Sequence, residues 1–401
     1  MRTTKPQDVP QRGGRLPRNV WVLSWVSFFN DTATEMSYWL LPQFLVGVLG
    51  AGPMVFGLIE GAAETVSSFA RLLSGWLSDR FHTRKPLVAA GYTAANIVKP
   101  FLAMATSWGQ VFWIRFMDRA AKGFRGAPRD ALLADSVSPS QRGSAFGLRQ
   151  AMDTAGALLG PLAALALLPV FSGKVRAVFW LAAVPGAVAI LLAWLAVSEV
   201  RPVVAAREPP LPLDLTVREL SRSTVWNRRL ALLMVAVGLF SLGNSSDLFL
   251  ILRAQNLGVR AVLAPALGLV FNLVYTSLSW PAGKLSDRVP RRILVVLGYF
   301  IYGAVYLGFS LSRGPKLVWV LFAVYGTYYA LTEGVLRAWI ADLVPSASRG
   351  SVYGVFNWLA GVAAFPASVL AGWLWRHYSP STPFFVSALL SFVAALLLWL
   401  A

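Results

Sequence analysis

The sequence predicts an all-α integral membrane protein in which twelve transmembrane helices form two pseudo-symmetric bundles of six. Three observations lead to this fold. Of the 401 residues, 56% are hydrophobic and 13% are charged, with a mean hydropathy of +0.59, whereas a soluble protein carries about 25% charged residues. About twelve stretches reach the roughly 20 mostly apolar residues that a membrane-spanning helix needs. The second half of the chain also repeats motifs of the first.

The expected spans follow one another along the chain after a polar tail. The first, second, fourth and tenth contain charged residues and have low hydropathy, but an even number of spans and the pattern of the loops require them. In chain order the expected spans are 20–48, 53–77, 86–106, 109–133, 144–170, 175–198, 229–252, 261–282, 292–312, 315–340, 350–374 and 381–400.

Lysine and arginine residues gather in alternate loops, as the positive-inside rule describes for membrane proteins. They are frequent in the tail, in the loop between the second and third spans, in the segment 199–228 and in the loop between the eighth and ninth spans. We therefore expect both termini in the cytoplasm, with no cleavable signal peptide. The net charge of +18 then reflects topology in a lipid bilayer and not a nucleic-acid partner.

The segment 199–228 is the one long interruption between spans. It is rich in proline and in mixed charges, which is typical of a linker. The expected organisation is a cytoplasmic tail (1–19), an N-terminal six-helix bundle (20–198), a cytoplasmic linker (199–228) and a C-terminal six-helix bundle (229–401).

Cysteine is absent, and histidine occurs only at His82 and His377. The chain therefore has no disulfide framework, thiolate metal site or cysteine nucleophile. We predict no cofactor, no metal site and no enzyme activity. A membrane-embedded sensor or an enzyme that acts on lipids is an alternative of a different class, although no nucleophile, base or metal constellation for an enzyme is present.

The two halves share motifs in the same order, which indicates an internal repeat. The segment 75–80, Gly-Trp-Leu-Ser-Asp-Arg, recurs as Gly-Lys-Leu-Ser-Asp-Arg at 283–288, and the pair Ala134-Asp135 recurs as Ala341-Asp342. Two parallel repeats of six helices are typical of transporters with a substrate site between the halves, near the bilayer midplane.

These motifs resemble the major facilitator superfamily over nearly the whole chain. The segment 75–85 is similar to the family signature between its second and third helices, and Arg115 with Phe116 falls at the arginine motif of its fourth helix. The stretch Gly-x-x-x-Gly-Pro at 156–161 is similar to the fifth-helix motif typical of antiporters, although the glycine pair that usually follows is replaced by Ala164-Leu165.

The resemblance implies a secondary transporter of the bacterial inner (cell) membrane, usually a monomer, that works by alternating access. We expect a proton-coupled exporter (an antiporter) of a small amphipathic organic compound, with sodium as the alternative to protons. The alternative within transport is uptake or exchange of an organic anion by a cationic cavity on the fourth helix.

The repeated motifs also provide the expected gating residues. The resemblance implies that the network of Asp79 latches the two halves on the cytoplasmic side, and the alternative is that this loop only anchors the topology. Small residues one turn apart let helices approach closely, and a proline bends a helix; ordinary packing is the alternative there. The expected gating residues are Gly75, Asp79, Arg80, Arg84, Arg129, Asp135, Gly156, Gly160, Pro161, Gly283, Asp287, Arg288, Arg337 and Asp342.

Carboxylates inside the spans are the candidates for proton coupling, because a charge at the bilayer centre costs at least about 2.5–3.5 kcal/mol. Asp31 and Glu35 lie one turn apart and repel each other, which favours protonation of one of them; ion pairs with cations of the second or fourth helix are the alternative. Glu60 and Glu64 are the second candidates, although Glu60 lies near the outer end, where it would be solvated. Asp153 is a further candidate, or a structural partner of Arg149.

The fourth span carries an unusual row of charges on one face: Arg115, Asp118, Lys122, Arg125 and Arg129, with Arg119 beside them. They either pair with carboxylates of neighbouring helices or line a water-filled cavity. Aromatic side chains at the same depth either pack or contact the substrate. The expected substrate-binding residues are Tyr38, Trp39, Arg119, Lys122, Asp247, Tyr275, Tyr328, Glu333 and Trp358.

Overall fold

A computed structural model describes residues 16–81, 83–137, 141–200, 228–286, 288–343 and 349–400, and in these ranges every regular element is helical. Most of the expected tail and linker lies outside them. In chain order the elements are α1 (Arg18–Tyr38), the π-helix η1 (Gln43–Val48), α2 (Pro53–Phe81), α3 (Lys85–Val98), α4 (Phe101–Met104), α5 (Trp108–Asp135), α6 (Arg142–Val170), α7 (Val175–Leu181), α8 (Ala183–Leu195), α10 (Arg228–Gly243), α11 (Leu248–Asn256), the 3-10 helix η3 (Ala261–Leu263), α12 (Ala264–Ser286), α13 (Arg291–Leu311), α14 (Lys316–Leu343), α15 (Arg349–His377) and α16 (Thr382–Leu400).

Local sequence signals fix many helix ends. Ser107 caps α5, since its hydroxyl accepts a hydrogen bond from the backbone N–H of Gln110. Pro86 occupies the first turn of α3, where the missing N–H costs nothing. Gly50 and Gly173 adopt positive φ values of 64° and 77° in the turns after η1 and α6, a conformation that glycine enters without a Cβ clash.

Seven helical segments in the described ranges are long and apolar enough to cross a membrane, or eight if the bent pair α10–α11 is one span. The long helices that fall short are α1, α2, α5 and α14. They correspond to the first, second, fourth and tenth expected spans, whose hydropathy the charged residues lower. The all-helical membrane fold is confirmed, and the count of twelve spans stays a prediction.

The expected first and seventh spans are wrong as continuous helices. The first is divided after Tyr38, and Gln43–Val48 forms the separate π-helix η1. The seventh is divided into α10 and α11, which are bent by 41°. The break falls on Asn244-Ser-Ser-Asp247, because the side chains of such residues bond to nearby backbone and compete with the helix.

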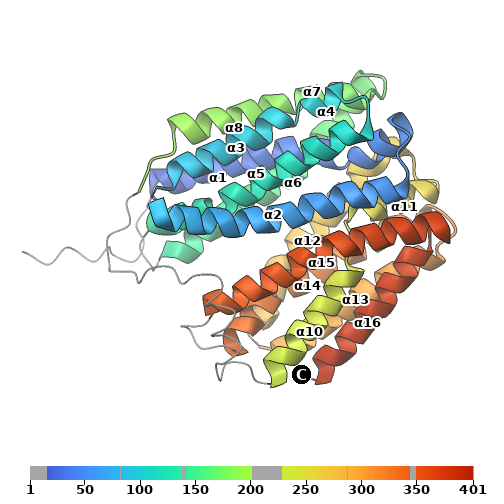
Figure 1. The fold of residues 1–401 in the computed structure, drawn as a ribbon. Helices are drawn as coiled ribbons and strands as arrows, with labels where there is room; N and C mark the ends of the chain where they lie inside the picture. Colours follow the sequence, from blue (N-terminus) through green and yellow to red (C-terminus); the bar gives the residue numbers. More distant parts are fainter. Residues whose placement is uncertain are drawn as a thin grey trace, which may run out of the picture.

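The helices before and after the gap at 201–227 form two groups (Figure 1). In the first group α1 packs on α6 and α8, and α2 on α5; in the second α13 packs on α14 and α16, and α12 on α14. Contacts between the groups run mainly through α2 with α15 and α6 with α12. Figure 1 shows the two groups converging near α11 and diverging towards the opposite end.

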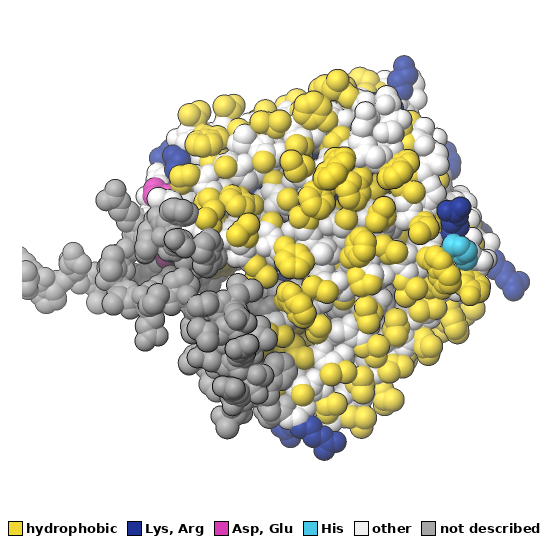
Figure 2. All heavy atoms as spheres, in the orientation of Figure 1, with side chains coloured by type: hydrophobic (Ala, Val, Ile, Leu, Met, Phe, Trp, Pro, Cys, Tyr) yellow, Lys and Arg dark blue, Asp and Glu magenta, His cyan; other side chains and the backbone are white. Residues whose placement is uncertain are grey.

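The end at which the groups diverge is called the basic end. Helices α3, α10 and α13 begin there, and basic residues stand at their starts: Arg84 and Lys85 at α3, Arg228 and Arg229 at α10, and Arg291 at α13. The other end, near α11, is called the outer end. Between them the surface is apolar: Figure 2 shows hydrophobic side chains spread over this face and Lys and Arg near its rim. Large apolar side chains such as Trp113, Trp280 and Leu195 are exposed, as lipid-facing residues are.

Glycines bring the two groups into backbone contact at the outer end. A Cβ added to Gly57 would lie 2.1 Å from the carbonyl oxygen of Ser368, and one added to Gly372 would lie 2.5 Å from that of Pro53. A Cβ on Gly61 would lie 3.2 Å from the Cβ of Ser368. The distances at Gly57 and Gly372 leave no room for side chains, so α2 and α15 close the outer end between them; the contact at Gly61 is less tight.

Because the chain has no native cysteine, a disulfide can test this closure. We expect the double variant Gly61→Cys, Ser368→Cys to cross-link on oxidation, since the two Cβ positions are near the spacing that a disulfide requires. Locked at the outer end, the protein should lose transport in proteoliposomes and regain it on reduction. Each single variant is the control, and full transport by the cross-linked protein would contradict the closure.

Candidate functional site

A cavity of about 410 Å³ lies between the two groups of helices, within the range of small-molecule sites. Polar side chains dominate its walls. It is lined by Tyr38, Glu64, Ser67, Ser68, Arg71, Leu72, Ser241, Asn244, Ser245, Ser246, Asp247, Tyr329, Asn357, Trp358, Ala360, Gly361, Ala364 and Ser368. A second cavity of about 200 Å³ shares Ser241, Asn244, Tyr329 and Ala360 with it and extends along α14 past Glu333 to Arg337.

Two cations of α5 are paired with carboxylates of α2. Arg115 donates from Nε and Nη2 to the two oxygens of Glu60, at 2.9 Å each, and the two side chains are 5% and 1% exposed. Arg119 Nη1 lies 3.4 Å from Glu64 Oε1. Glu60 is therefore buried in a bidentate ion pair rather than solvated at the outer end.

Tyr38 contacts both of these arginines and also lines the 410 Å³ cavity. The guanidinium carbons of Arg115 and Arg119 lie 5.7 and 5.6 Å from the centre of its ring, which is within cation–π range. The ring itself lines the 410 Å³ cavity. Tyr38 is therefore shared between the two guanidinium groups and the lining of this cavity.

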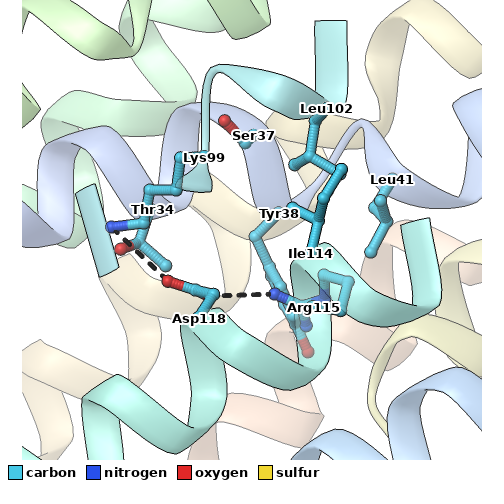
Figure 3. A pocket seen from close by; sticks show the side chains of 9 residues that line it. All are labelled: Thr34, Ser37, Tyr38, Leu41, Lys99, Leu102, Ile114, Arg115 and Asp118. Carbon is cyan, nitrogen blue, oxygen red and sulfur yellow. Dashed lines mark ion pairs between the residues drawn. The ribbon is translucent and has the colours of Figure 1, made fainter. Parts of the chain in front are cut away.

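A buried polar network continues behind Tyr38, between α1, α3 and α5. Figure 3 shows Asp118 between Lys99 and Arg115, with N–O distances of 3.9 and 3.5 Å. Lys99 also donates to the side-chain oxygens of Asn30 and Asn96, at 3.4 and 3.1 Å. The amide partners were not among the predicted site residues, and only the buried charge of Lys99 could have pointed to them, since such a group needs acceptors.

Asp31 and Glu35 take part in no ion pair among the described residues. Asp31 accepts a hydrogen bond from Asn30, at 2.9 Å, and Glu35 accepts one from Trp39 Nε1, at 2.7 Å. The alternative of ion pairs with the second or fourth helix is therefore not observed. The positive charges that interact electrostatically with Glu35 are those of Lys122 and Arg119.

The Gly-Pro motif of α6 packs directly against these two carboxylates. A Cβ on Gly156 would lie 2.5 Å from the carbonyl oxygen of Phe28 and 3.2 Å from the Cβ of Asp31, and one on Gly160 would lie 2.6 Å from the Cβ of Glu35. Asp153, one turn earlier on α6, pairs with Arg149 at 2.5 Å and interacts electrostatically with Asp31.

The remaining cations of α5 have other surroundings. Arg125 is buried with its guanidinium carbon 4.5 Å from the centre of the Tyr92 ring. Arg129 pairs with its neighbour Asp130, at 3.0 Å. Lys122 is exposed and has no ion pair or hydrogen bond with the described residues. Most charged side chains of α5 thus form ion pairs or stack on an aromatic ring, and Lys122 does neither with the described residues.

In the second group of helices, tyrosines surround Asp247, the carboxylate that this group contributes to the 410 Å³ cavity. Asp247, at the break between α10 and α11, accepts hydrogen bonds from Tyr325, at 2.5 Å, and from Tyr329, at 2.9 Å. Tyr275 donates to Glu333 at 2.7 Å. Tyr328 is buried in the same aromatic cluster, and the exposed Trp358 lines the larger cavity.

Trp39 lies away from the cavity, at the outer end. Its ring occupies the space beside Gly268 of α12, where an added Cβ would lie 2.2 Å from Cε2, and its centre is 6.4 Å from that of Phe271. Asn272 of α12 donates to the carbonyl oxygen of Ala157 on α6, at 3.3 Å. Trp39 therefore belongs to the contact between the two groups and not to the lining of either large cavity.

At the basic end the repeat produces equivalent ion pairs. Arg84 at the start of α3 pairs with Asp135 at the end of α5, and Arg291 at the start of α13 pairs with Asp342 near the end of α14, at 2.7 Å. Glu199 accepts hydrogen bonds from the backbone N–H groups of Arg84 and Lys85, where the helix dipole favours an anion.

Other predicted gating positions are less informative. The side chains of Asp79 and Arg80, and the whole of Asp287, lie outside the described residues. A Cβ on Gly75 would contact Ala127 at 3.5 Å, and one on Gly283 would meet nothing. Pro161 lies within α6, and Arg288 is exposed. In the described part of the chain no three His, Asp and Glu side chains are grouped as metal ligands.

The burial of Glu60 and Arg115 gives a stability prediction. Glu60→Gln should leave a buried guanidinium poorly compensated and lower the free energy of unfolding by about 3–5 kcal/mol. Glu64→Gln should cost clearly less, because the Glu64 side chain is 45% exposed. Thermal unfolding in detergent measures both. The double variant Glu60→Gln, Arg115→Gln should recover part of the loss, and equal losses for the two single variants would contradict the assignment.

The comparisons with known proteins agree with this architecture. A model of the Major Facilitator Superfamily matches residues 23–368 and 249–401. The chain is 34% identical to an uncharacterised MFS-type transporter of Methanocaldococcus jannaschii, over 96% of this chain and 94% of that protein. It is 30% identical to the multidrug resistance protein MdtH of Photorhabdus laumondii, but over only 31% of this chain and 30% of MdtH.

The fold is also that of solved transporters. The crystal structure of the D323A mutant of the nucleoside transporter NupG superposes with a TM-score of 0.78 at 14% identity, covering 95% of this chain and 99% of that one. The helices in two groups, the polar cavity between them and the family match lead to one conclusion: the chain belongs to the major facilitator superfamily of transporters.

Proposed function

We propose that this transporter is a proton-coupled antiporter of the inner membrane that exports a small amphipathic organic compound by alternating access, as a monomer. The observation that carries the proposal is the position of Asp31 and Glu35. They are membrane-embedded carboxylates without a cationic partner among the described residues, and they contact the Gly-Pro motif of α6. Such residues in a transporter are proton-relay candidates.

The geometry also supplies a connection from proton binding to the outer end. An ionised Glu35 accepts a strong, charge-assisted hydrogen bond from Trp39, and protonation weakens that bond. The Trp39 ring in turn fills the space beside Gly268 of α12, across the contact between the groups. Loss of a proton from Glu35 therefore favours the closed outer end, and gain of a proton releases it.

The orientation follows from the charge distribution. The basic end faces the cytoplasm under the positive-inside rule, so the diverging helices in Figure 1 correspond to an inward-facing arrangement. The pairs Arg84–Asp135 and Arg291–Asp342 stabilise the rims that approach when this end closes. Export is supported by the partial likeness to a multidrug resistance protein and by the α6 motif, and the anion alternative is weakened by the pairing of Arg115 and Arg119.

The coupling can be tested with purified protein in proteoliposomes. A panel of amphipathic organic compounds is first screened for compound-dependent proton flux with a pH-sensitive dye trapped inside the vesicles. We expect Glu35→Gln and Asp31→Asn to abolish accumulation driven by a proton gradient, because neither amide binds a proton, while counterflow exchange of labelled compound continues. Either variant that keeps full gradient-driven accumulation is not the coupling site. Absence of proton flux with the whole panel would reject proton antiport.

The link from Glu35 to the outer end gives a second prediction. Trp39→Phe removes the indole N–H but keeps a ring beside Gly268, so the closed outer end should lose about one charge-assisted hydrogen bond. Maleimide labelling of Ser368→Cys, a position only 3% exposed, should then become roughly tenfold faster. In the Glu35→Gln background the same substitution should add much less. Equal increases in both backgrounds would show that Trp39 acts independently of Glu35.

A further inference from the structure

Two side chains of opposite charge line the 410 Å³ cavity without an ionic partner among the described residues. They are Arg71 of α2 and Asp247 at the break between α10 and α11. The neighbouring charges of the cavity region are paired with each other: Glu64 with Arg119, and Glu60 with Arg115. The charges that remain for a ligand are therefore one cation on one wall and one anion on the other.

Asp247 offers an anionic contact from the second group of helices. Both of its oxygens accept hydrogen bonds, from the hydroxyls of Tyr325 and Tyr329, which fix the orientation of the carboxyl group. Within the described residues no lysine or arginine forms an ion pair with it, and the charged side chain whose effect reaches it is the carboxylate of Glu64. An ammonium group in the cavity would be the missing positive partner.

Arg71 offers the complementary contact from the first group. It is exposed, and its guanidinium donates no hydrogen bond to any described residue. Charged side chains of both signs act on it: Asp130 and Glu64 attract it, and Arg129 and Arg337 repel it. Asp130 is already paired with Arg129. A carboxylate or other anionic group in the cavity could accept both donors of this fork.

The rest of the cavity lining suits a small polar ligand with an apolar part. Hydroxyl and amide side chains such as Ser67, Asn244 and Asn357 supply hydrogen bonds, while Tyr38 and Trp358 supply ring faces. A purely anionic ligand would leave Asp247 unmatched, and a purely cationic one would leave Arg71 unmatched. Burying an unmatched charge beside a ligand lowers affinity.

We propose that the transported compound is a small zwitterion, whose ammonium group lies against Asp247 and whose anionic group lies against Arg71. This assignment rests on the proposed transport function and narrows its substrate class. It also explains how a ligand recruits both groups of helices at once, since each charge contacts a different wall of the cavity. Lys122, an exposed cation of α5, does not line this cavity.

The test compares zwitterions with derivatives that lack one charge. The probes are glycine, β-alanine, L-leucine, L-phenylalanine and the dipeptide L-alanyl-L-leucine, each with its carboxamide (a cation) and its N-acetyl derivative (an anion). Thermal unfolding of the purified full-length protein is measured with each probe at equal concentration. At least one zwitterion should raise the unfolding midpoint by roughly 2 °C or more, and its two derivatives should not.

The variants assign each charge. Asp247→Asn should weaken binding of the active zwitterion about tenfold or more, and Arg71→Gln should do the same. Carboxamides should lose their residual affinity only in Asp247→Asn, and N-acetyl derivatives only in Arg71→Gln. Arg260→Gln, an exposed arginine outside the cavity, is the matched control and should change nothing.

The outcomes separate this inference from the proposed function. Equal binding of a zwitterion and one of its singly charged derivatives, or no response to any zwitterion, would overturn the zwitterion site. Proton flux driven by a singly charged amphipathic compound would do the same while leaving proton antiport intact. A zwitterion that binds as expected but drives no proton flux would support the site and reject the coupling.

Discussion

The cost of placing charges inside a membrane determines the arrangement of this protein. Each charged side chain at this depth needs a partner, a hydrogen-bonded setting or water. The bidentate pair Glu60–Arg115 meets the requirement almost completely, as both side chains are buried and share two hydrogen bonds. Because that pair joins α2 to α5, it also orients the rest of α5, including Arg119 above Tyr38 and Asp118 beside Lys99.

The two groups of helices meet this constraint differently although they share a repeat. The first group uses ion pairs, and the second uses phenolic hydroxyls around Asp247 and beside Glu333. The two groups remain alike at the basic end, where the ion pairs Arg84–Asp135 and Arg291–Asp342 occupy corresponding positions in the repeat. A shared scaffold with unlike walls gives a cavity with a cationic and an anionic side, which a symmetric duplication would not provide.

Much of the fold could be predicted from the sequence, because hydropathy, loop charge and repeated motifs each report on it. The four charged helices α1, α2, α5 and α14 were predicted from the loop pattern, and their role as membrane spans stays a prediction. Spacing alone showed that the cations of α5 share a face, but not that Glu60 and Glu64 lie opposite, since this depends on packing between helices. The bond from Trp39 to Glu35 has a local signal, a spacing of one turn. The break at Asn244–Asp247 had one too, a run of residues that compete with the helix.

If Asp31 and Glu35 bind the coupled proton, as proposed, the position of the α6 glycines links proton binding to helix movement. Gly156 and Gly160 contact α1 at the residues that carry the candidate carboxylates, so any shift of α6 against α1 changes the surroundings of Asp31 and Glu35. A carboxylate that loses water on one side favours its neutral form, and a neutral Glu35 holds Trp39 less firmly. In the proposed mechanism, backbone contact, protonation and closure of the outer end are coupled within two turns of one helix, and a larger side chain at either glycine would disturb all three together.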